Sequence, residues 1–347
     1  MMRKVLTQSN WGGLAVTEEP VPELKPGELL VEVEASVISA GTELSGLRGK
    51  SAAVGGEERW RSFGYQNAGR VIGWGEHTSG FSLGQRVACM GGPYALHGTH
   101  AAVPVNLAVP LPDEVSFEEG AFVALAATAL QAVRRAELQL GEFTLVMGLG
   151  LVGQLTGQLA QIAGTHVLGA DRMPLRIEAA RRGGGFEEVI GAESSLLETS
   201  RRMTRGYGLD CTFICFGGDA TEAFKEAVTA MKHSPDSHVN GRVVIVGGAT
   251  ITHRFGAPLG NLDIRSSART GPGYHDKQYE YGADYPQVFV PWDTKRNIAE
   301  IMGWIASGRL NVRDLISHRV PLEQAPNICR MIVEEPEKTL GVVVTMK

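Results

Sequence analysis

FTLVMGLGLVG, residues 143–153, joins an apolar run to a G-x-G-x-x-G motif, and this junction decides the fold. The run FTLVMG at 143–148 predicts a buried strand, and the residues from about Leu151 to Ala163 predict a helix. The next apolar run, THVLGAD at 165–171, predicts a second strand and ends in Asp171, 23 residues after Gly148. A glycine motif between strand and helix, with an acid ending the next strand, is typical of a dinucleotide-binding unit.

Each glycine of the motif has a mechanical purpose in such a unit. Gly148 permits a tight turn, Gly150 lets the backbone approach a pyrophosphate, and Gly153 allows the helix to pack closely on the strand. The N-terminus of the helix offers N–H groups and the positive end of its dipole to the phosphates. The alternative is a glycine-rich turn that binds nothing, which the register of strand, helix and acid disfavours.

The acid at the end of the second strand predicts which nicotinamide cofactor is bound. Asp171 can accept hydrogen bonds from the ribose hydroxyls and would repel a 2′-phosphate, which favours NAD over NADP. Arg172 weakens this preference, because a guanidinium can clamp a phosphate or stack on adenine. We also predict cofactor contacts at Leu151, Val152, Arg176, Thr128, Gly217 and Gly247.

Toward the C-terminus of this junction, strand and helix patterns continue to alternate. A helix is predicted through Arg182, and EEVIGA, LDCTFICFG and GRVVIVGG predict strands at 187–192, 209–217 and 241–248. Near-continuous apolar strands that alternate with helices predict an α/β fold with a doubly wound parallel sheet. HSPDSHVN at 233–240 is predicted to form a surface loop.

Toward the N-terminus, residues 1–120 are turn-rich and strand-like. LLVEVEASVIS at 29–39 alternates as a half-buried strand does, and GRVIGWG at 69–75 and GQRVACM at 84–90 are short strands between glycines. The first long helix is predicted over Phe117–Glu137. The change of period near residue 120 indicates a second structural unit.

The last part of the chain changes character again. RTGPGYHDKQYEYGADYPQVFVPW at 269–292 is aromatic-rich and irregular. Helices are predicted at about 294–307 and 322–334, and the chain closes on a strand at 341–347.

Composition excludes several classes of protein. The 347 residues carry 33 Lys and Arg against 38 Asp and Glu, a net charge of −5, which argues against nucleic acid as a partner. The four cysteines form no C-x-x-C pair, which argues against a disulfide framework and a four-cysteine zinc lobe. The N-terminus has no apolar signal region, and the longest apolar stretch, Ala121–Val133, is too short for a ~20-residue membrane span. These features predict a cytoplasmic protein with no membrane partner.

The order of these parts resembles the medium-chain dehydrogenase/reductase superfamily of alcohol-dehydrogenase-like proteins. The resemblance covers nearly the whole chain and is carried by PGELLVEVEASVIS at 26–39, GYQNAGRVIGWG at 64–75, LGQRV at 83–87, LPDEVSFEEGAFVALAATALQAV at 111–133, GLDCTFICFGG at 208–218 and NGRVVIVGG at 240–248. It implies a GroES-like, β-rich catalytic domain from residues 1–123 and 270–347, and a Rossmann domain at 124–269. It also implies a homodimer or homotetramer.

The zinc ligands of the family are missing from the positions that match them. Where zinc-dependent members carry Cys-Gly-Thr-Asp, this chain has Ala40-Gly41-Thr42-Glu43, and where they carry Gly-His-Glu it has Gly64-Tyr65-Gln66. The third ligand position falls near Ala124. Because a catalytic zinc site needs three protein ligands, we expect neither a catalytic nor a structural zinc. ISAGTE at 38–43 with GY at 64–65 is similar to a zinc-independent branch that includes bacteriochlorophyllide hydroxyethyl dehydrogenases and some sugar- or cyclitol-pathway dehydrogenases.

Without zinc, a side chain must handle the proton of the reacting hydroxyl. Tyr65 matches the lost histidine ligand, so its phenol either bonds the substrate oxygen or fills the space of the ion. Thr42 matches the family hydroxyl that passes the proton toward solvent, or else bonds its own turn. Glu43 matches an acid that orients a metal ligand, and here it would hold Tyr65, a loop or a polar substrate.

The fourth candidate lies in the aromatic segment. His275 next to Asp276 would make a base of suitable strength, and Tyr274, Tyr281, Tyr285 and Trp292 could wall a sugar-like ring. The alternative is a surface or subunit-contact loop with a solvated His275. His97 and His100 have a metal-like spacing but lack a third ligand, and we expect no role for them.

The expected function is that of a zinc-independent, NAD(H)-dependent dehydrogenase. It would transfer hydride between nicotinamide and a secondary alcohol or ketone of a sugar, cyclitol or related polar ring, a small-molecule substrate. One alternative is an NADPH-dependent enone or quinone reductase, which Asp171 disfavours. Another is a non-catalytic nucleotide-binding protein that lost activity together with zinc.

Overall fold

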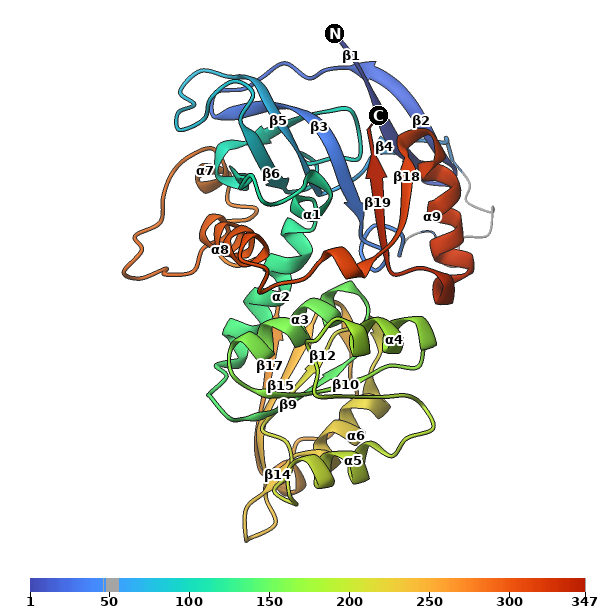
Figure 1. The fold of residues 1–347 in the computed structure, drawn as a ribbon, viewed down its shortest axis with the longest axis vertical. Coiled ribbons are helices and arrows are strands. Elements are labelled where there is room, and N and C mark those ends of the chain that lie inside the picture. The colour runs from blue at the N-terminus through green and yellow to red at the C-terminus, as the bar shows by residue number, and fades with distance from the viewer. Residues whose placement is uncertain (46, 48–55, 347) are drawn as a thin grey trace. The chain divides into compact units, whose positions relative to one another are not determined.

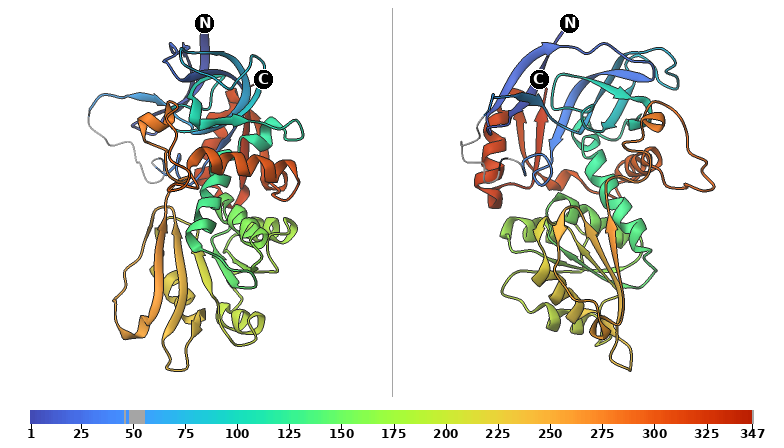
Figure 2. Two further views of the ribbon diagram at one scale, coloured as in Figure 1. Left: turned by 90° about the vertical axis from the view of Figure 1, so that its left-hand side faces the viewer. Right: turned by 180° about the vertical axis from the view of Figure 1, so that it is seen from behind.

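A computed structural model describes residues 1–45, 47 and 56–346 (Figure 1). The chain forms two compact units. One contains Met1–Ala127 and Thr270–Lys347, and the other contains Thr128–Arg269. Figure 2 shows the same ribbon from two further sides. Each unit is described by itself below.

The second unit is built on a parallel sheet with the strand order β11-β10-β9-β12-β15-β17. Its strands are β9 (Phe143–Met147), β10 (His166–Ala170), β11 (Glu188–Ile190), β12 (Cys211–Ile214), β15 (Val239–Val246) and β17 (Asn261–Ser267). In chain order this is 3-2-1-4-5-6, the doubly wound arrangement of the Rossmann fold. The α/β fold predicted from the alternating pattern is therefore confirmed.

Four helices accompany this sheet: α3 (Leu151–Ile162), α4 (Pro174–Arg182), α5 (Leu196–Met203) and α6 (Thr221–Ala230). Helix α3 packs on β9 and β10, α4 on β10 and β11, and α6 on β12 and α5. The central strands are buried on both faces, with Leu145, Leu168 and Phe213 wholly inside. This burial explains why these strands read as apolar runs. The small strands are β13 (Gly218–Asp219), β14 (Lys232–His233) and β16 (Ala249–Thr250).

The first unit is dominated by antiparallel strands. Its larger sheet has the order β18-β19-β3-β5-β6-β8, with β7 also paired to β3, and its smaller sheet has the order β2-β1-β4. The bounds are β1 (Met2–Ser9), β2 (Leu14–Pro20), β3 (Glu28–Ile38), β4 (Trp60–Ser62), β5 (Gln66–Trp74), β6 (Arg86–Met90), β7 (His100–Pro104), β8 (Ala108–Pro110), β18 (Ile316–Pro321) and β19 (Gly341–Thr345). The last strand, β19, pairs with β3 so that Val342 lies opposite Ile38. Both ends of the chain thus build one β-rich unit.

The helices of the first unit lie between and after these strands. They are α1 (Phe117–Gly120), α2 (Val123–Ala136), α7 (Lys277–Glu280), α8 (Thr294–Ala306) and α9 (Ala325–Glu334). The boundary between the units falls within α2. One-turn 3₁₀ segments occur in this unit at η1 (Val105–Leu107), η3 (Arg313–Leu315), η4 (Leu322–Gln324) and η5 (Pro336–Lys338), and in the second unit at η2 (Ala257–Leu259). Among the described residues, no helix is long and apolar enough to cross a membrane.

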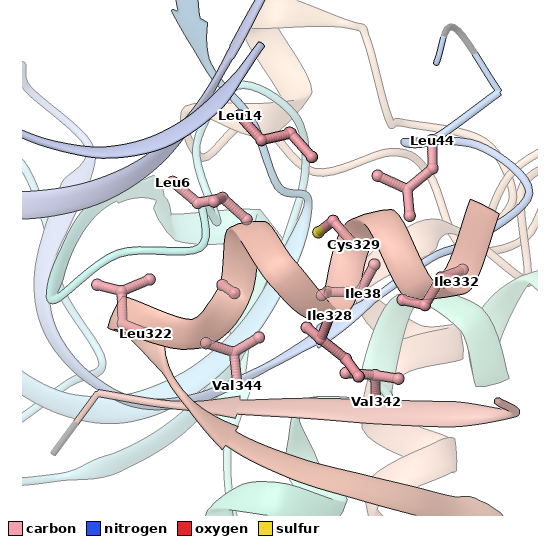
Figure 3. Packing of buried hydrophobic residues seen from close by; sticks show 11 residues of the cluster. Leu6, Leu14, Ile38, Leu44, Leu322, Ile328, Cys329, Ile332, Val342 and Val344 are labelled. Carbon is pink, nitrogen blue, oxygen red and sulfur yellow. The ribbon is translucent and has the colours of Figure 1, made fainter. Parts of the chain in front are cut away.

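Helix α9 covers one core of the first unit (Figure 3). Ile328, Cys329 and Ile332 on α9 meet strands β1, β3 and β19 through the cluster Leu6, Ile38, Leu44, Val342 and Val344. Burying such side chains stabilises the unit by about 1.5–3 kcal/mol each. Leu44 lies in the turn that follows β3, directly after Glu43 in the sequence. Its burial in this core anchors the turn that carries Glu43, a member of the polar cluster described below.

Some predicted elements differ from the observed ones. The helix predicted over Phe117–Glu137 begins at Phe117 as expected, where Ser116 and Glu119 form a capping box, but it is broken into α1, which ends at Gly120, and α2, which begins at Val123. The break escaped detection because the flanking residues are all buried, which erases any helical period. The segment predicted as a surface loop at 233–240 is the tip of a β-hairpin, in which residues 235–237 are exposed and His233 on β14 pairs with Val239 on β15.

Candidate active site

The glycine-rich turn after β9 has the conformation that its sequence predicts. Gly148 has a φ of +87°, in the left-handed region that favours glycine. A β-carbon on Gly153 would lie 1.9 Å from the carbonyl oxygen of Gly148, so the helix can approach the turn only with glycine there. The glycine motif therefore lets the backbone of α3 pack directly against the backbone of the turn.

The N-terminus of α3 completes this turn. Gly150 is the N-cap and has no side chain to bond the first turn of the helix. The N–H groups of Leu151, Val152 and Gly153 lie in that first turn, where the helix itself provides no acceptors. Backbone donors and the positive end of a helix dipole are suited to a pyrophosphate.

Asp171 is tied to this turn from the neighbouring strand. One carboxylate oxygen accepts the N–H of Leu149 at 2.6 Å, and the other accepts the N–H of Met173 at 2.8 Å. Arg176 Nη1 lies 3.8 Å from Asp171 Oδ2, and the Asp171 side chain is only 6% exposed. Arg172 is exposed. Asp171 therefore holds the glycine turn, and its hydrogen bonds to the ribose hydroxyls stay a prediction.

The predicted cofactor residues of this unit share one edge of the sheet. Gly148, Asp171, Gly217 and Gly247 follow the carboxyl ends of β9, β10, β12 and β15, which are neighbours in the sheet. The direction of the strand order reverses between β9 and β12, and ligands of doubly wound folds bind at this reversal. Gly217 and Gly247 are exposed. Thr128 is half-buried on α2, away from these strand ends in the sequence.

In the first unit, a polar cluster follows the end of β3. The Glu43 side chain is 5% exposed, and one of its oxygens accepts the N–H of Ser39 at 2.7 Å. The other oxygen lies 3.1 Å from His97 Nε2. His97 Nδ1 lies 2.8 Å from Ser36 Oγ, and both of these residues are wholly buried. The chain Ser36–His97–Glu43 is thus a continuous buried hydrogen-bond network.

Tyr65 is the next member of this polar cluster. The residue is half-buried. Burial raises the pKa of its phenol, the Glu43 carboxylate raises it further, and hydrogen bonds with Ser39 and Thr42 partly oppose them. The structure therefore brings together three of the predicted catalytic residues, Tyr65, Thr42 and Glu43, and keeps the phenol protonated.

His97 is the residue of this cluster that sequence reasoning missed. The sequence predicts no role for it, because the spacing of His97 and His100 suggests only a metal site, and a third ligand is missing. Residues 36, 43 and 97 are brought together by strand pairing, which no local spacing encodes. The one available signal was the placing of two histidines, His97 and His100, in the mostly apolar stretch ALHGTHAAV at 95–103.

The aromatic segment contributes a different residue from the expected one. Gly92 donates its N–H to the Tyr274 phenol oxygen at 2.8 Å, and Tyr274 is close enough to Tyr65 to influence its titration. His275 is exposed and its ring stacks on Tyr274, with ring centroids 3.9 Å apart. Asp276 caps α7 and accepts the hydroxyl of Tyr285 at 2.6 Å. A catalytic role for His275 stays a prediction.

The side chains at the family's zinc positions do not suit zinc. Gln66 uses both ends of its amide on backbone groups, donating to the carbonyl of Val37 and accepting the N–H of Leu125, each at 3.1 Å. Ala40 and Ala124 have no donor atom. Among the described residues, no three His, Cys, Asp or Glu side chains are grouped to hold a metal ion. This donor set is chemically unlike that of a tetrahedral zinc site.

Comparisons with known proteins agree with this architecture. Residues 152–280 match the zinc-binding dehydrogenase family, a range that excludes positions 40, 65 and 124. The chain is 26% identical to mouse (Mus musculus) sorbitol dehydrogenase over 97% of this chain and 93% of that protein. It is 35% identical to a putative D-xylulose reductase of Agrobacterium fabrum over 64% of this chain and 55% of that protein.

A solved structure supports the fold over the full length. Galactitol-1-phosphate dehydrogenase from Escherichia coli superimposes with a TM-score of 0.77 at 18% sequence identity, covering 99% of both chains. Together with the strand order, the glycine turn and the paired chain ends, these matches confirm the resemblance of the chain to the medium-chain dehydrogenase/reductase superfamily.

Proposed function

We propose that this protein is a zinc-independent, NAD(H)-dependent dehydrogenase that transfers hydride between nicotinamide and a secondary alcohol of a polyol, sugar or cyclitol. The observation that carries the proposal is the Tyr65 phenol at the family's metal position, bonded to Ser39 and Thr42 beside the Glu43 carboxylate. The sorbitol and xylulose enzymes among its relatives support a polyol substrate. We also propose that the first unit is the catalytic domain and the second is the nucleotide-binding domain.

In the nucleotide-binding unit, the glycine turn and the N-terminus of α3 would hold the pyrophosphate. Asp171 would accept the ribose hydroxyls with its remaining lone pairs, and Arg176 beside it would face the phosphates. A 2′-phosphate would meet the Asp171 carboxylate, which is the basis for proposing NAD rather than NADP. When bound, the nicotinamide accepts hydride from the alcohol carbon or returns it to the ketone.

In the catalytic unit, the Tyr65 phenol would donate a hydrogen bond to the reacting oxygen. In the direction of ketone reduction, it would supply the proton as negative charge develops on that oxygen. The Thr42 hydroxyl, bonded to Tyr65 and exposed, would return a proton from solvent. In alcohol oxidation the same groups act in reverse, and the alcohol proton leaves through Tyr65 and Thr42.

The proposal is tested by following the absorbance of reduced nicotinamide with a metal chelator present throughout. One arm supplies NAD with cyclic polyols, sugars and secondary alcohols, and the other supplies NADPH with enones and quinones. Chelator-resistant reduction of NAD by a polyol supports the proposal. Oxidation of NADPH by an enone would assign the protein to the reductase class, and loss of polyol activity on chelation would show that a metal is required.

A further inference from the structure

His97 is a buried imidazole that the proposed reaction leaves without a role. Its side chain is wholly inside the first unit, and the Phe63 ring meets it edge-on at 5.5 Å. Its N–H donates to the carbonyl of Phe63, and its carbonyl accepts the N–H of Leu6. A β-carbon on Gly64 would lie 2.4 Å from the His97 nitrogen, so the chain packs tightly at this point. The imidazole is therefore held in one place by the backbone on either side.

The two ring nitrogens have different partners. Glu43 as a carboxylate can only accept, so His97 Nε2 carries the hydrogen across the 3.1 Å separation. In the neutral ring, Nδ1 then accepts the hydroxyl of Ser36 at 2.8 Å. The order Ser36–His97–Glu43 is that of a serine–histidine–acid triad, but Ser36 is wholly buried on β3, where a substrate cannot reach its hydroxyl, so the trio is not a nucleophilic serine site.

The Glu43 carboxylate lies in surroundings that give it little other support. Among the described residues, His97 is the one basic side chain that pairs with Glu43. Leu44 and Cys329 belong to the apolar core beside it, and the negative charge of Glu43 adds to the effect of burial in raising the pKa of the Cys329 thiol to about 12. A buried carboxylate needs hydrogen bonds to remain charged, and Glu43 receives them from His97 and the Ser39 backbone.

Glu43 in turn acts on Tyr65. Ser39 links the two groups, because its N–H bonds Glu43 and its side chain bonds the phenol. The charged or titratable groups that face Tyr65 are Glu43 from the turn after β3 and Tyr274 from the aromatic segment. We infer that His97 is a positioning residue, whose Nε2–H holds the Glu43 carboxylate beside Tyr65 so that Tyr65 meets the substrate as a phenol. The inference rests on the proposed function for the reaction it serves, and the contacts can be tested without turnover.

The test measures the titration of Tyr65 in the full-length protein. The protein is labelled with fluorotyrosine, whose phenol is more acidic than that of tyrosine, and the Tyr65 signal is assigned in the fluorine NMR spectrum with Tyr65→Phe. His97→Phe keeps a ring but removes both nitrogens, whereas His97→Gln retains an N–H that can reach Glu43. Glu43→Gln removes the charge itself. His100→Phe is the matched control, because His100 is half-buried on β7 and bonds Thr99.

We expect the Tyr65 titration to move to lower pH in His97→Phe and Glu43→Gln, and to stay in place in His97→Gln and His100→Phe. His97→Asn, whose amide is too short to reach Glu43, gives the same shift as His97→Phe and replaces it if that variant does not fold. In kinetics, kcat for ketone reduction falls at least about tenfold in His97→Phe and is restored in His97→Gln.

The outcomes separate this inference from the proposed function. A folded His97→Phe or His97→Asn with an unshifted Tyr65 titration overturns the positioning role, and so does an unshifted titration in Glu43→Gln. If the titrations shift as expected but the wild-type protein oxidises no polyol, the positioning of Glu43 by His97 stands and the proposed function fails.

Discussion

The β-carbon that Gly153 lacks would lie 1.9 Å from the carbonyl oxygen of Gly148. Two non-bonded atoms cannot approach so closely, and a backbone carbonyl cannot rotate out of the way as a flexible side chain can. Replacing Gly153 with alanine must therefore push α3 away from the turn or distort the turn itself. The glycine turn and the N-terminus of α3, which would both contact the pyrophosphate, are then displaced.

Gly153→Ala is expected to weaken NAD binding by at least about tenfold, or 1.4 kcal/mol. Cofactor binding is measured by quenching of intrinsic fluorescence. Gly303→Ala is the matched control, because Gly303 is also in a helix, α8, and a β-carbon there meets nothing within 4 Å. Equal NAD affinity in both variants would show that the glycine turn does not hold the cofactor.

Asp171 has two tasks that substitution can separate. Asp171→Asn keeps one oxygen for the Leu149 N–H and removes the charge, whereas Asp171→Ser removes both. We expect Asp171→Asn and Asp171→Ser to raise the NADP-to-NAD ratio of kcat/KM at least about tenfold, because the repulsion of a 2′-phosphate is lost. Asp171→Ser should also lower the melting temperature more than Asp171→Asn. An unchanged cofactor ratio in both variants would contradict the assignment of Asp171 to the ribose.

Tyr65→Phe removes only the phenol oxygen. If that oxygen is the proton donor, kcat should fall about 10²- to 10⁴-fold, the range for general acid–base groups, while NAD affinity is unchanged because the cofactor residues lie in the other unit. Steady-state kinetics with a polyol and fluorescence binding of NAD give the two readings. Tyr207→Phe is the control, since Tyr207 is 78% exposed in the nucleotide unit. Wild-type kcat in Tyr65→Phe would exclude the phenol from the chemistry.

The two units differ in how much of them could be predicted from the sequence. The second unit could be predicted from local sequence patterns, because each of its buried strands is one apolar run and the glycine turn is a contiguous motif. The edge strand β17 was missed, since its polar residues Asn261, Asp263 and Arg265 interrupt any apolar run. In the catalytic unit, Tyr65 and Glu43 were found through their positions in family motifs. His97 was not, because its contact with Glu43 depends on how β3 and the segment before β7 are brought together in space.

Gln66 is the residue after Tyr65, in the stretch that matches the family's Gly-His-Glu motif. Its buried amide joins the carbonyl of Val37 on β3 to the N–H of Leu125 on α2. Gln66→Ala leaves both backbone groups unpaired in the interior and should lower the free energy of unfolding by about 2–5 kcal/mol through lost hydrogen bonds and a cavity. Denaturant unfolding measures it, with the exposed Gln161→Ala as control. Added zinc should not raise the melting temperature of the wild type. A zinc-dependent rise would contradict the proposal that the protein is zinc-independent.

Glu119 gives a prediction about pH. Burial would raise the pKa of its carboxyl, but the hydroxyl and N–H of Ser116 and the Arg313 guanidinium outweigh it and hold that pKa below its ordinary value of 4.5. A depressed pKa means that the folded state prefers the charged form, so the stabilisation is complete above the ordinary pKa and disappears as the pH falls through the folded value. The melting temperature of Glu119→Gln should therefore lie below that of the wild type at pH 7, and the gap should narrow as the pH is lowered below 4.5. Glu114→Gln, on the exposed turn before α1, is the control and should show no such trend. A gap for Glu119→Gln that stays constant with pH would mean that the capping box stabilises α1 without its charge.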